Sequence, residues 1–186
     1  MHVSIGLIGF GAVGKAFAEL TEQIVERDNF RIHAILVRDI ADKKFSDVEI
    51  TTDSDWFVLS NGHNIIIDAS SYNEETKGYI LASLLDGKDL ITCSKELVNK
   101  HWRELLDAAK VGGSKIYFNS IPSTDDISCK FNGIDLTSSN FEQYADDDLY
   151  VYRGGNAEIT AQFIYNDVVR LLKERIERHG AWEDSQ

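Results

Sequence analysis

The chain has 186 residues, of which 19 are Lys or Arg and 31 are Asp or Glu, so its formal net charge is −12. Domains average roughly 150 residues, and a chain of this length is therefore expected to form one sizeable core with little left over. The acidic balance argues against binding to nucleic acid or to an anionic membrane, because both partners require a net basic face.

Strands and helices alternate over the first 120 residues of the predicted structure. In chain order, the pattern predicts a strand at 5–8, a helix at 15–27, strands at 31–37 and 48–51, a brief helix at 53–59, a strand at 64–68, a helix at 74–85, a strand at 90–92, a helix at 96–109 and a strand at 115–119. This alternation indicates βαβ crossovers and a parallel sheet that is covered on both faces.

The alternation ends after residue 120. The remaining sequence predicts a strand at 128–134, a short capped helix at 137–144, a strand at 149–153 and a long amphipathic helix at 156–178. The apolar stripe of that last helix consists of Ile159, Phe163, Val168, Leu171, Leu172 and Ile176. No apolar run approaches the roughly 20 residues that span a bilayer, so no membrane partner is expected. The apolar run at 3–17 is broken by four glycines, which favours a buried strand and its turn over a signal peptide.

A glycine motif, Gly9-x-Gly11-x-x-Gly14, lies between the first predicted strand and the first helix. In dinucleotide-binding folds the first glycine permits a tight turn, the second lets the backbone approach a pyrophosphate, and the third lets helix and strand pack closely. We therefore expect residues 9–14, including Phe10, Ala12 and Val13, to bind the pyrophosphate at the helix N-terminus. The alternative is a glycine-rich turn that binds nothing. The fold class predicted is α/β, a Rossmann-type doubly wound and mostly parallel sheet.

Arg38 and Asp39 end the second predicted strand, where an acidic residue accepts from the ribose 2′-hydroxyl and an Arg accommodates a 2′-phosphate. The guanidinium recognises phosphate with its forked donors, and two lysines follow at 43 and 44. These residues favour NADP(H), with NAD(H) also possible in a pocket of mixed preference. Alternatively, Arg38 pairs with Asp39 or Asp42 on the surface.

Polar residues also follow the strands at 64–68 and 90–92. The hydroxyls of Ser70 and Ser71 could donate to the cofactor, although Ser71 is about equally suited to cap the next helix. Thr92, Ser94 and Lys95 occupy the same rim after the next strand. The ammonium of Lys95 could polarise a carbonyl or hold a substrate carboxylate. The competing interpretation is an exposed lysine that opens a helix.

Cysteine and histidine predict no further site. Cys93 and Cys129 lack Cys-rich spacing, which favours reduced thiols and a cytoplasmic location. The helix start near Cys93 could lower its pKa, but no His or second Cys is spaced as a partner, so it is not predicted to be a nucleophile. The five histidines and the acidic triplet at 146–148 lack the spacing of metal ligands, and no metal site is predicted.

These motifs, in this order, resemble homoserine dehydrogenase. The segments that carry the resemblance are 8–14, 34–39, 68–71 and 87–95, the last of which is similar to the motif Gly-Lys-x-Val-Val-Thr-Ala-Asn-Lys. The final lysine of that motif is an active-site residue in the family, and the resemblance assigns this role to Lys95. Ser94 stands where the family has Asn, and Phe118 falls about where it has the Glu of a monovalent-cation site.

The resemblance resumes beyond the break. Residues 131–137 are similar to the family's Val-Glu-Gly-Ile-x-x-Ile-Thr segment, and 153–161 resemble an element whose helix returns to the nucleotide-binding domain near the cofactor. That match implies that Gly154 and Gly155 contact cofactor, while Asn156 replaces a family glycine. The family's Asp-x-x-x-Lys catalytic pair has no counterpart here.

The resemblance implies an NADP-dependent oxidoreductase of amino-acid biosynthesis, which transfers hydride between NADP(H) and a small aldehyde or alcohol such as aspartate semialdehyde or homoserine. It divides the chain into a nucleotide-binding domain (1–125), a reduced substrate or dimerisation region (126–153) and a C-terminal helix that packs back (154–186). An edge strand within 127–153 would need cover, which favours a homodimer. The alternative is a non-catalytic NADP(H)-binding module or partner subunit.

Overall fold

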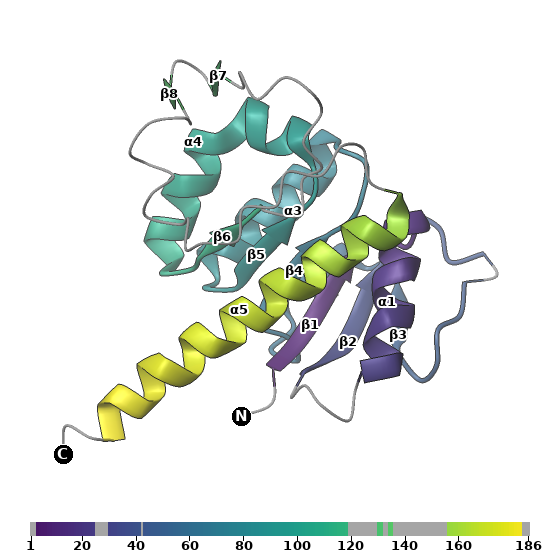
Figure 1. Ribbon diagram of the computed structural model, residues 1–186. Coiled ribbons are helices and arrows are strands. Elements are labelled where there is room, and N and C mark those ends of the chain that lie inside the picture. The colour runs from purple at the N-terminus through teal and green to yellow at the C-terminus, as the bar shows by residue number, and fades with distance from the viewer. Residues whose placement is uncertain are drawn as a thin grey trace.

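Six strands form one sheet in the computed structural model, which describes residues 3–24, 30–41, 43–118, 130–131, 134–135 and 156–183. The elements in chain order are β1 Val3–Ile8, α1 Ala12–Ile24, β2 Phe30–Leu36, β3 Glu49–Thr51, α2 Ser54–Leu59, β4 Ile65–Asp68, α3 Glu74–Leu85, β5 Asp89–Thr92, α4 Lys95–Gly112, β6 Ile116–Tyr117, β7 Lys130–Phe131, β8 Ile134–Asp135 and α5 Ala157–Glu183 (Figure 1).

The strand order is β3-β2-β1-β4-β5-β6, and every neighbouring pair is parallel. Chain order therefore reverses between β1 and β4, the point at which doubly wound sheets bind dinucleotides. The register aligns Ile8 with both Leu36 and Asp68, and Asp68 with Thr92. The turns that follow these four strands consequently leave the sheet at one edge. The predicted Rossmann-type fold is confirmed.

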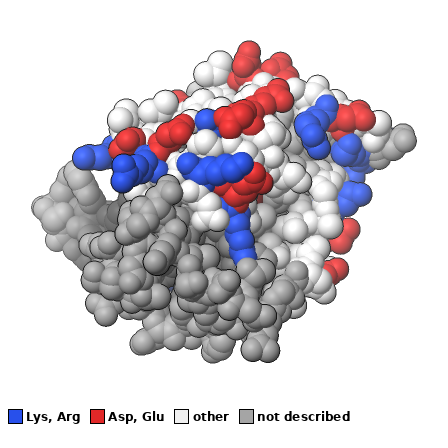
Figure 2. Space-filling model, turned by 90° about the horizontal axis from the view of Figure 1, so that it is seen from above, with Lys and Arg blue, Asp and Glu red and all other residues white. Residues whose placement is uncertain are grey.

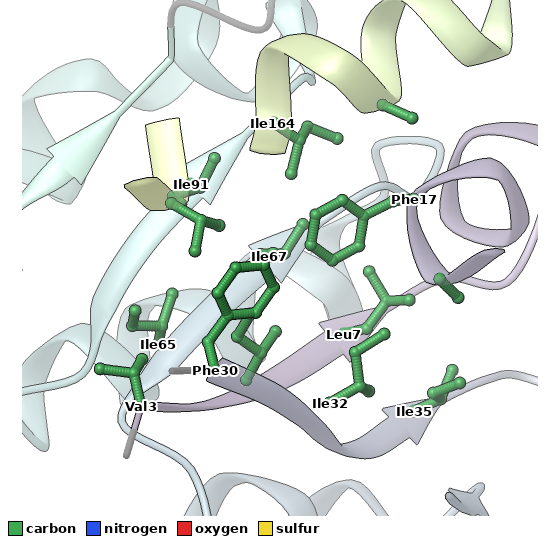
Figure 3. Packing of buried hydrophobic residues seen from close by; sticks show 14 of the residues in the cluster. Val3, Leu7, Phe17, Phe30, Ile32, Ile35, Ile65, Ile67, Ile91 and Ile164 are labelled. Carbon is green, nitrogen blue, oxygen red and sulfur yellow. The ribbon is translucent and has the colours of Figure 1, made fainter. Parts of the chain in front are cut away.

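Both faces of the sheet are buried, which explains the unbroken apolar run Ile65–Ile67 in the central strand β4. Along β4, Ile65 and Ile67 face one core, in which Phe17 of α1 and Ile164 of α5 also lie (Figure 3). Ile66 faces the opposite core, which includes Ile80 of α3 and Leu97 of α4. Residues that alternate in the strand thus fill two separate layers.

Helix α5 packs back on the first core beside α1 (Figure 1). Its buried apolar residues, among those whose side chains the structure describes, are Ala161, Ile164, Val168 and Leu171. The predicted stripe was wrong at its start, because Ile159 is 39% exposed. Oδ1 of Asn156 accepts from the Ile159 amide at 3.0 Å, so Ile159 belongs to a solvent-facing first turn. The helix begins as predicted but continues to Glu183.

Three further predictions differ from the structure. Helix α1 begins at Ala12 within the glycine motif, and α4 runs through Gly112 because its αL cap is Gly113, with φ 70°. The single strand at 128–134 was wrong: β7 and β8 pair antiparallel. The sequence between them is Asn132-Gly133, a dipeptide favoured in tight hairpins. The predicted elements at 137–144 and 149–153 lie outside the described residues.

Candidate functional site

Gly9 forms the turn that leaves β1, and the fold requires a glycine there. Its φ is +93°, a conformation that side chains disfavour. A Cβ at Gly9 would also lie 2.9 Å from both the Ala69 oxygen and the Ser70 Cα. The Gly9 amide donates to the Leu36 carbonyl at 2.9 Å. The turn is therefore held between the end of β2 and the segment after β4.

Gly14 and Gly11 differ in the space that a side chain would have at each position. A Cβ at Gly14 would lie 2.3 Å from the Gly9 carbonyl oxygen, so α1 packs too closely on the turn for a side chain. A Cβ at Gly11 would meet no atom within 4 Å, and Gly11 is exposed. The first helical bond runs from the Lys15 amide to the Gly11 carbonyl, so the amides of 12–14 have no acceptor within the helix. Open space thus adjoins amides suited to a phosphate.

The side chain of Phe10, the residue after Gly9, is buried. Its ring is 8% exposed and meets Phe45 edge-on, with ring centroids 5.9 Å apart. Nζ of Lys15 lies 5.8 Å from the Phe10 ring centroid. The Phe10 side chain is therefore almost fully buried and does not face solvent at the turn.

Arg38 and Asp39 are exposed beyond β2. Oδ1 of Asp39 accepts from the Ala41 amide at 3.0 Å, and the Asp39 carbonyl accepts from Nζ of Lys43. Among the described residues, Arg38 forms no ion pair with Asp39; the other suggested partner, Asp42, lies outside the described residues. Lys43 is thereby held close to Asp39, the neighbour of Arg38 in the sequence.

Asp68 organises the rim at the ends of β4 and β5. The side chain is 1% exposed; Oδ1 accepts from the Ser70 amide at 3.1 Å and from its hydroxyl at 2.7 Å, and Oδ2 accepts from the Thr92 hydroxyl at 2.8 Å. Burial raises the pKa of Asp68, and these donors oppose the rise. This role of Asp68 was not predicted, although an acidic residue at the end of an apolar strand is a recognisable signal.

The hydroxyls of Thr92 and Ser94 shape the same rim. Thr92 Oγ1 accepts from the Ser94 amide at 3.0 Å, and Ser94 Oγ caps α4 by accepting from the Leu97 amide at 3.3 Å. Ser71 is exposed and does not cap α3, since Oδ1 of Asn73 accepts from the Thr76 amide at 2.8 Å. The suggested capping role of Ser71 was therefore wrong, and its hydroxyl faces the surface.

Lys95 is the first residue of α4 and is half-buried at the rim. The neighbouring Cys93 donates from Sγ to the Asp68 carbonyl at 3.4 Å. Burial, followed by the charge of Asp68, raises the pKa of Cys93 to about 12. The suggestion that the helix start lowers this pKa was wrong, because burial and the charge of Asp68 raise it. Gly154 and Gly155 lie outside the described residues.

The described surface seen from above carries basic and acidic side chains side by side (Figure 2). Among the described residues, no three His, Cys, Asp or Glu side chains are grouped so that they could hold a metal ion. The same part of the chain contains no helix with an apolar stretch that could cross a bilayer.

The chain is similar in sequence to known proteins of one family. The family described as "Homoserine dehydrogenase, NAD binding domain" matches residues 9–119. The homoserine dehydrogenase of Bacillus subtilis is 27% identical over 127 residues, which cover 63% of this chain and 29% of the relative. That of Corynebacterium glutamicum is 29% identical over 126 residues, 63% of this chain and 28% of the relative. The chain thus spans less than a third of either relative.

Solved structures show the same fold. A homoserine dehydrogenase of S. aureus at pH 6.5 aligns with a TM-score of 0.58 and 27% identity over 63% of this chain and 32% of its own. A hyperthermophilic archaeal homoserine dehydrogenase in complex with NADPH aligns with a TM-score of 0.52 and 23% identity, over 64% of this chain and 44% of its own.

Proposed function

This chain belongs to the homoserine dehydrogenase family, and we propose that its crevice at the carboxyl edge of the sheet binds NADP(H). The proposal fits the residues present. The fold itself requires glycine at 9 and 14, whereas the space beside Gly11 is open. A pyrophosphate could approach Gly11 and accept from the amides of 12–14 at the positive end of α1. The open space at Gly11 is the observation that carries the proposal.

We propose a preference for NADP(H), with NAD(H) bound more weakly. The exposed guanidinium of Arg38 supports this preference, since its forked donors suit a 2′-phosphate. Lys43, held over the same turn by the Asp39 carbonyl, adds a second positive charge. Asp39 uses Oδ1 to accept from Ala41, which leaves Oδ2 for a ribose hydroxyl.

The reaction we propose is hydride transfer between NADP(H) and a small aldehyde or alcohol, such as aspartate semialdehyde or homoserine. The bound nicotinamide supplies the hydride chemistry. Lys95 polarises the substrate oxygen with its ammonium, as the family resemblance implies. Ser70, Thr92 and Ser94 form the rim, and Ser71 offers a hydroxyl to the cofactor.

We also propose the division into a nucleotide-binding domain (1–125), a reduced region (126–153) and a returning helix (154–186). Gly154 and Gly155 would bring the start of that helix to the cofactor. A homodimer in the cytoplasm is proposed with this division; sedimentation that shows a monomer at working concentrations would contradict the dimer.

NADPH fluorescence on titration with the full chain tests binding, and absorbance of NADPH with homoserine or aspartate semialdehyde tests turnover. We expect both binding and turnover. Binding without turnover of any small aldehyde or alcohol would instead identify a non-catalytic NADP(H)-binding module. Failure to bind either nicotinamide nucleotide would refute the proposed function.

A further inference from the structure

Two neighbouring strands end in residues whose side chains are hydrogen-bonded to each other. Asp68 ends β4 and is 1% exposed. Its Oδ1 accepts from the amide and the hydroxyl of Ser70, and its Oδ2 accepts from the hydroxyl of Thr92. Thr92 ends β5 and is fully buried. The carboxyl group of Asp68 therefore joins the ends of two strands and is itself enclosed.

The Ser70 amide determines which atom donates between Ser70 and Asp68. An amide N–H can only donate, so it requires Oδ1 to be an acceptor. This holds whether Asp68 is ionised or neutral, because a neutral carboxyl group carries its proton on one oxygen only, which is then Oδ2. Oγ of Ser70 lies 2.7 Å from the same Oδ1, a usual separation for a hydroxyl that donates to oxygen. The hydroxyl proton of Ser70 therefore points to Asp68.

The Ser70 oxygen is left with its lone pairs. A serine hydroxyl has one proton and two lone pairs, and the proton is already directed at Oδ1. Another molecule can consequently donate an N–H or O–H to Ser70. A phosphate oxygen is itself an acceptor, so it gains no hydrogen bond from this hydroxyl.

Ser70 lies directly against the glycine turn. A Cβ at Gly9 would be 2.9 Å from the Ser70 Cα, and a Cβ at Gly14 would be 3.8 Å from that of Ala69. Strands β1 and β4 are neighbours at the point where chain order reverses, at which doubly wound sheets bind dinucleotides. Ser70 is half-buried, whereas Asp68 is enclosed. Of these two side chains, a ligand in the crevice would meet Ser70.

The strand order indicates which half of a dinucleotide would lie beside Ser70. The function proposed above puts the 2′-phosphate at Arg38, after β2, and the pyrophosphate at Gly11, after β1. Strand β4 lies on the opposite side of β1 from β2. The nicotinamide nucleoside would then extend over the end of β4. That nucleoside carries two kinds of donor, the ribose O–H groups and the carboxamide N–H groups.

We propose that Asp68 is a positioning residue: it fixes the Ser70 hydroxyl as an acceptor, which binds an O–H or N–H donor of the nicotinamide nucleoside. This inference rests on the NADP(H) binding proposed above. Asp68 acts on the cofactor only through Ser70, because its own oxygens are enclosed. The same arrangement gives the pyrophosphate no partner at Ser70 and favours its binding to the amides of 12–14.

Ser70→Ala removes the acceptor. In titrations of the full chain it should weaken NADPH binding by about 5-fold or more. Binding of 2′-phosphoadenosine 5′-diphosphate, which keeps the phosphates but lacks the nicotinamide nucleoside, should stay within about 2-fold of the parent value. An equal loss for both ligands, or no loss for NADPH, would overturn the proposal.

A cofactor analogue identifies the donor. The 3-acetylpyridine analogue of NADPH keeps both riboses but has an acetyl group in place of the carboxamide, and so lacks its N–H groups. If Ser70→Ala weakens NADPH and spares this analogue, the carboxamide is the donor. If it weakens both equally and spares the diphosphate, a ribose hydroxyl is the donor.

Two substitutions of Asp68 test whether it acts through Ser70. Asp68→Asn keeps an oxygen for the Ser70 amide and hydroxyl, so NADPH binding should stay within about 2-fold of the parent value. Asp68→Ala should lose as much affinity as Ser70→Ala, and the double variant should lose no more than either. Additive losses would contradict the positioning role. If Asp68→Ala does not fold, a loss in Asp68→Asn equal to that of Ser70→Ala would contradict it instead.

Ser114→Ala is the matched control. The Ser114 hydroxyl is also half-buried and also donates to an oxygen, the Leu84 carbonyl at 3.0 Å, but Ser114 precedes β6 at the opposite edge of the sheet. Its removal should change the affinity for none of these ligands. If the parent chain binds neither NADPH nor the diphosphate, the proposed function fails and this inference fails with it. A parent chain that binds NADPH no better than Ser70→Ala does refutes this inference alone.

Discussion

Nη2 of Arg175 in α5 donates to Oδ2 of Asp89, the first residue of β5, at 2.7 Å, although the two residues are 86 positions apart. Oδ1 of Asp89 accepts from the Lys115 amide at 2.8 Å, and Nη2 also lies 3.3 Å from the Asn64 carbonyl oxygen. This ion pair therefore joins the C-terminal helix α5 to the amino ends of the central strands β4 and β5.

Replacement of Arg175 by Met should lower the free energy of unfolding by about 3 kcal/mol, because it leaves the buried Asp89 carboxylate without its cation. Urea denaturation measures the change. Arg103→Met is the control, since Arg103 is exposed on α4 and its loss should cost less than about 0.5 kcal/mol. Equal stability of Arg175→Met and the parent chain would show that this pair does not anchor α5.

Gly11→Ala should weaken NADPH binding by about 10-fold or more, because a methyl group would intrude between the pyrophosphate and the helix amides. The change in unfolding free energy should stay below about 0.5 kcal/mol, since a Cβ at Gly11 meets no protein atom within 4 Å. Gly78→Ala, also in open space but within α3, should stabilise the fold by about 0.5–1 kcal/mol and leave binding unchanged. Fluorescence titration and denaturation measure the two effects. Unaltered affinity in Gly11→Ala would remove the main support for the proposed site.

Arg38→Ala should weaken the binding of NADPH by about 10-fold or more and leave the binding of NADH nearly unchanged. Only NADPH has a 2′-phosphate that can accept from the guanidinium. Dissociation constants for both nucleotides give the ratio. Arg31→Ala, an exposed arginine near the other end of β2, should affect neither nucleotide. An equal loss of affinity for NADPH and NADH would refute the role of Arg38 in specificity.

His63 should make the fold less stable in acid. Its ring is 2% exposed, and within the described chain neither nitrogen has a hydrogen-bond partner. Burial, then the charges of Lys88 and His33, lowers its pKa from 6.5 to about 4. Between pH 6.5 and about 4, His63 is protonated in the unfolded chain but remains neutral in the folded chain. This group's stabilisation is therefore present above pH 6.5 and lost as pH falls toward 4.

The loss at the lower end of that window is about 3 kcal/mol, and denaturation midpoints measured across it should show the decline. His63→Gln cannot titrate, so its stability should vary less with pH than that of the parent chain. Parallel pH profiles for the two chains would contradict the role assigned to His63.

Local patterns were enough to predict the glycine turn and most of the sheet. Within the strand–turn–helix unit, Gly9 is needed for its positive φ and Gly14 for its close contact with the Gly9 carbonyl. The apolar run Ile65–Ile67 needs only a sheet that is covered on both faces. Arg38 was placed beyond β2 by the same reasoning. The single strand predicted at 128–134 was wrong because β7 and β8 pair with each other, and the sequence between them, Asn132-Gly133, is one that favours a tight turn.

The sequence by itself determined the βαβ alternation and the position of the glycine motif, because both depend on residues within a few positions of one another. Only the tertiary structure decided the partners of Asp68, the face that α5 buries and the pairing of Tyr72 with His101, which lie 29 positions apart. Burial and hydrogen-bond partners are set by atoms that the fold brings together across the sheet. No pattern along the chain encodes such contacts on its own.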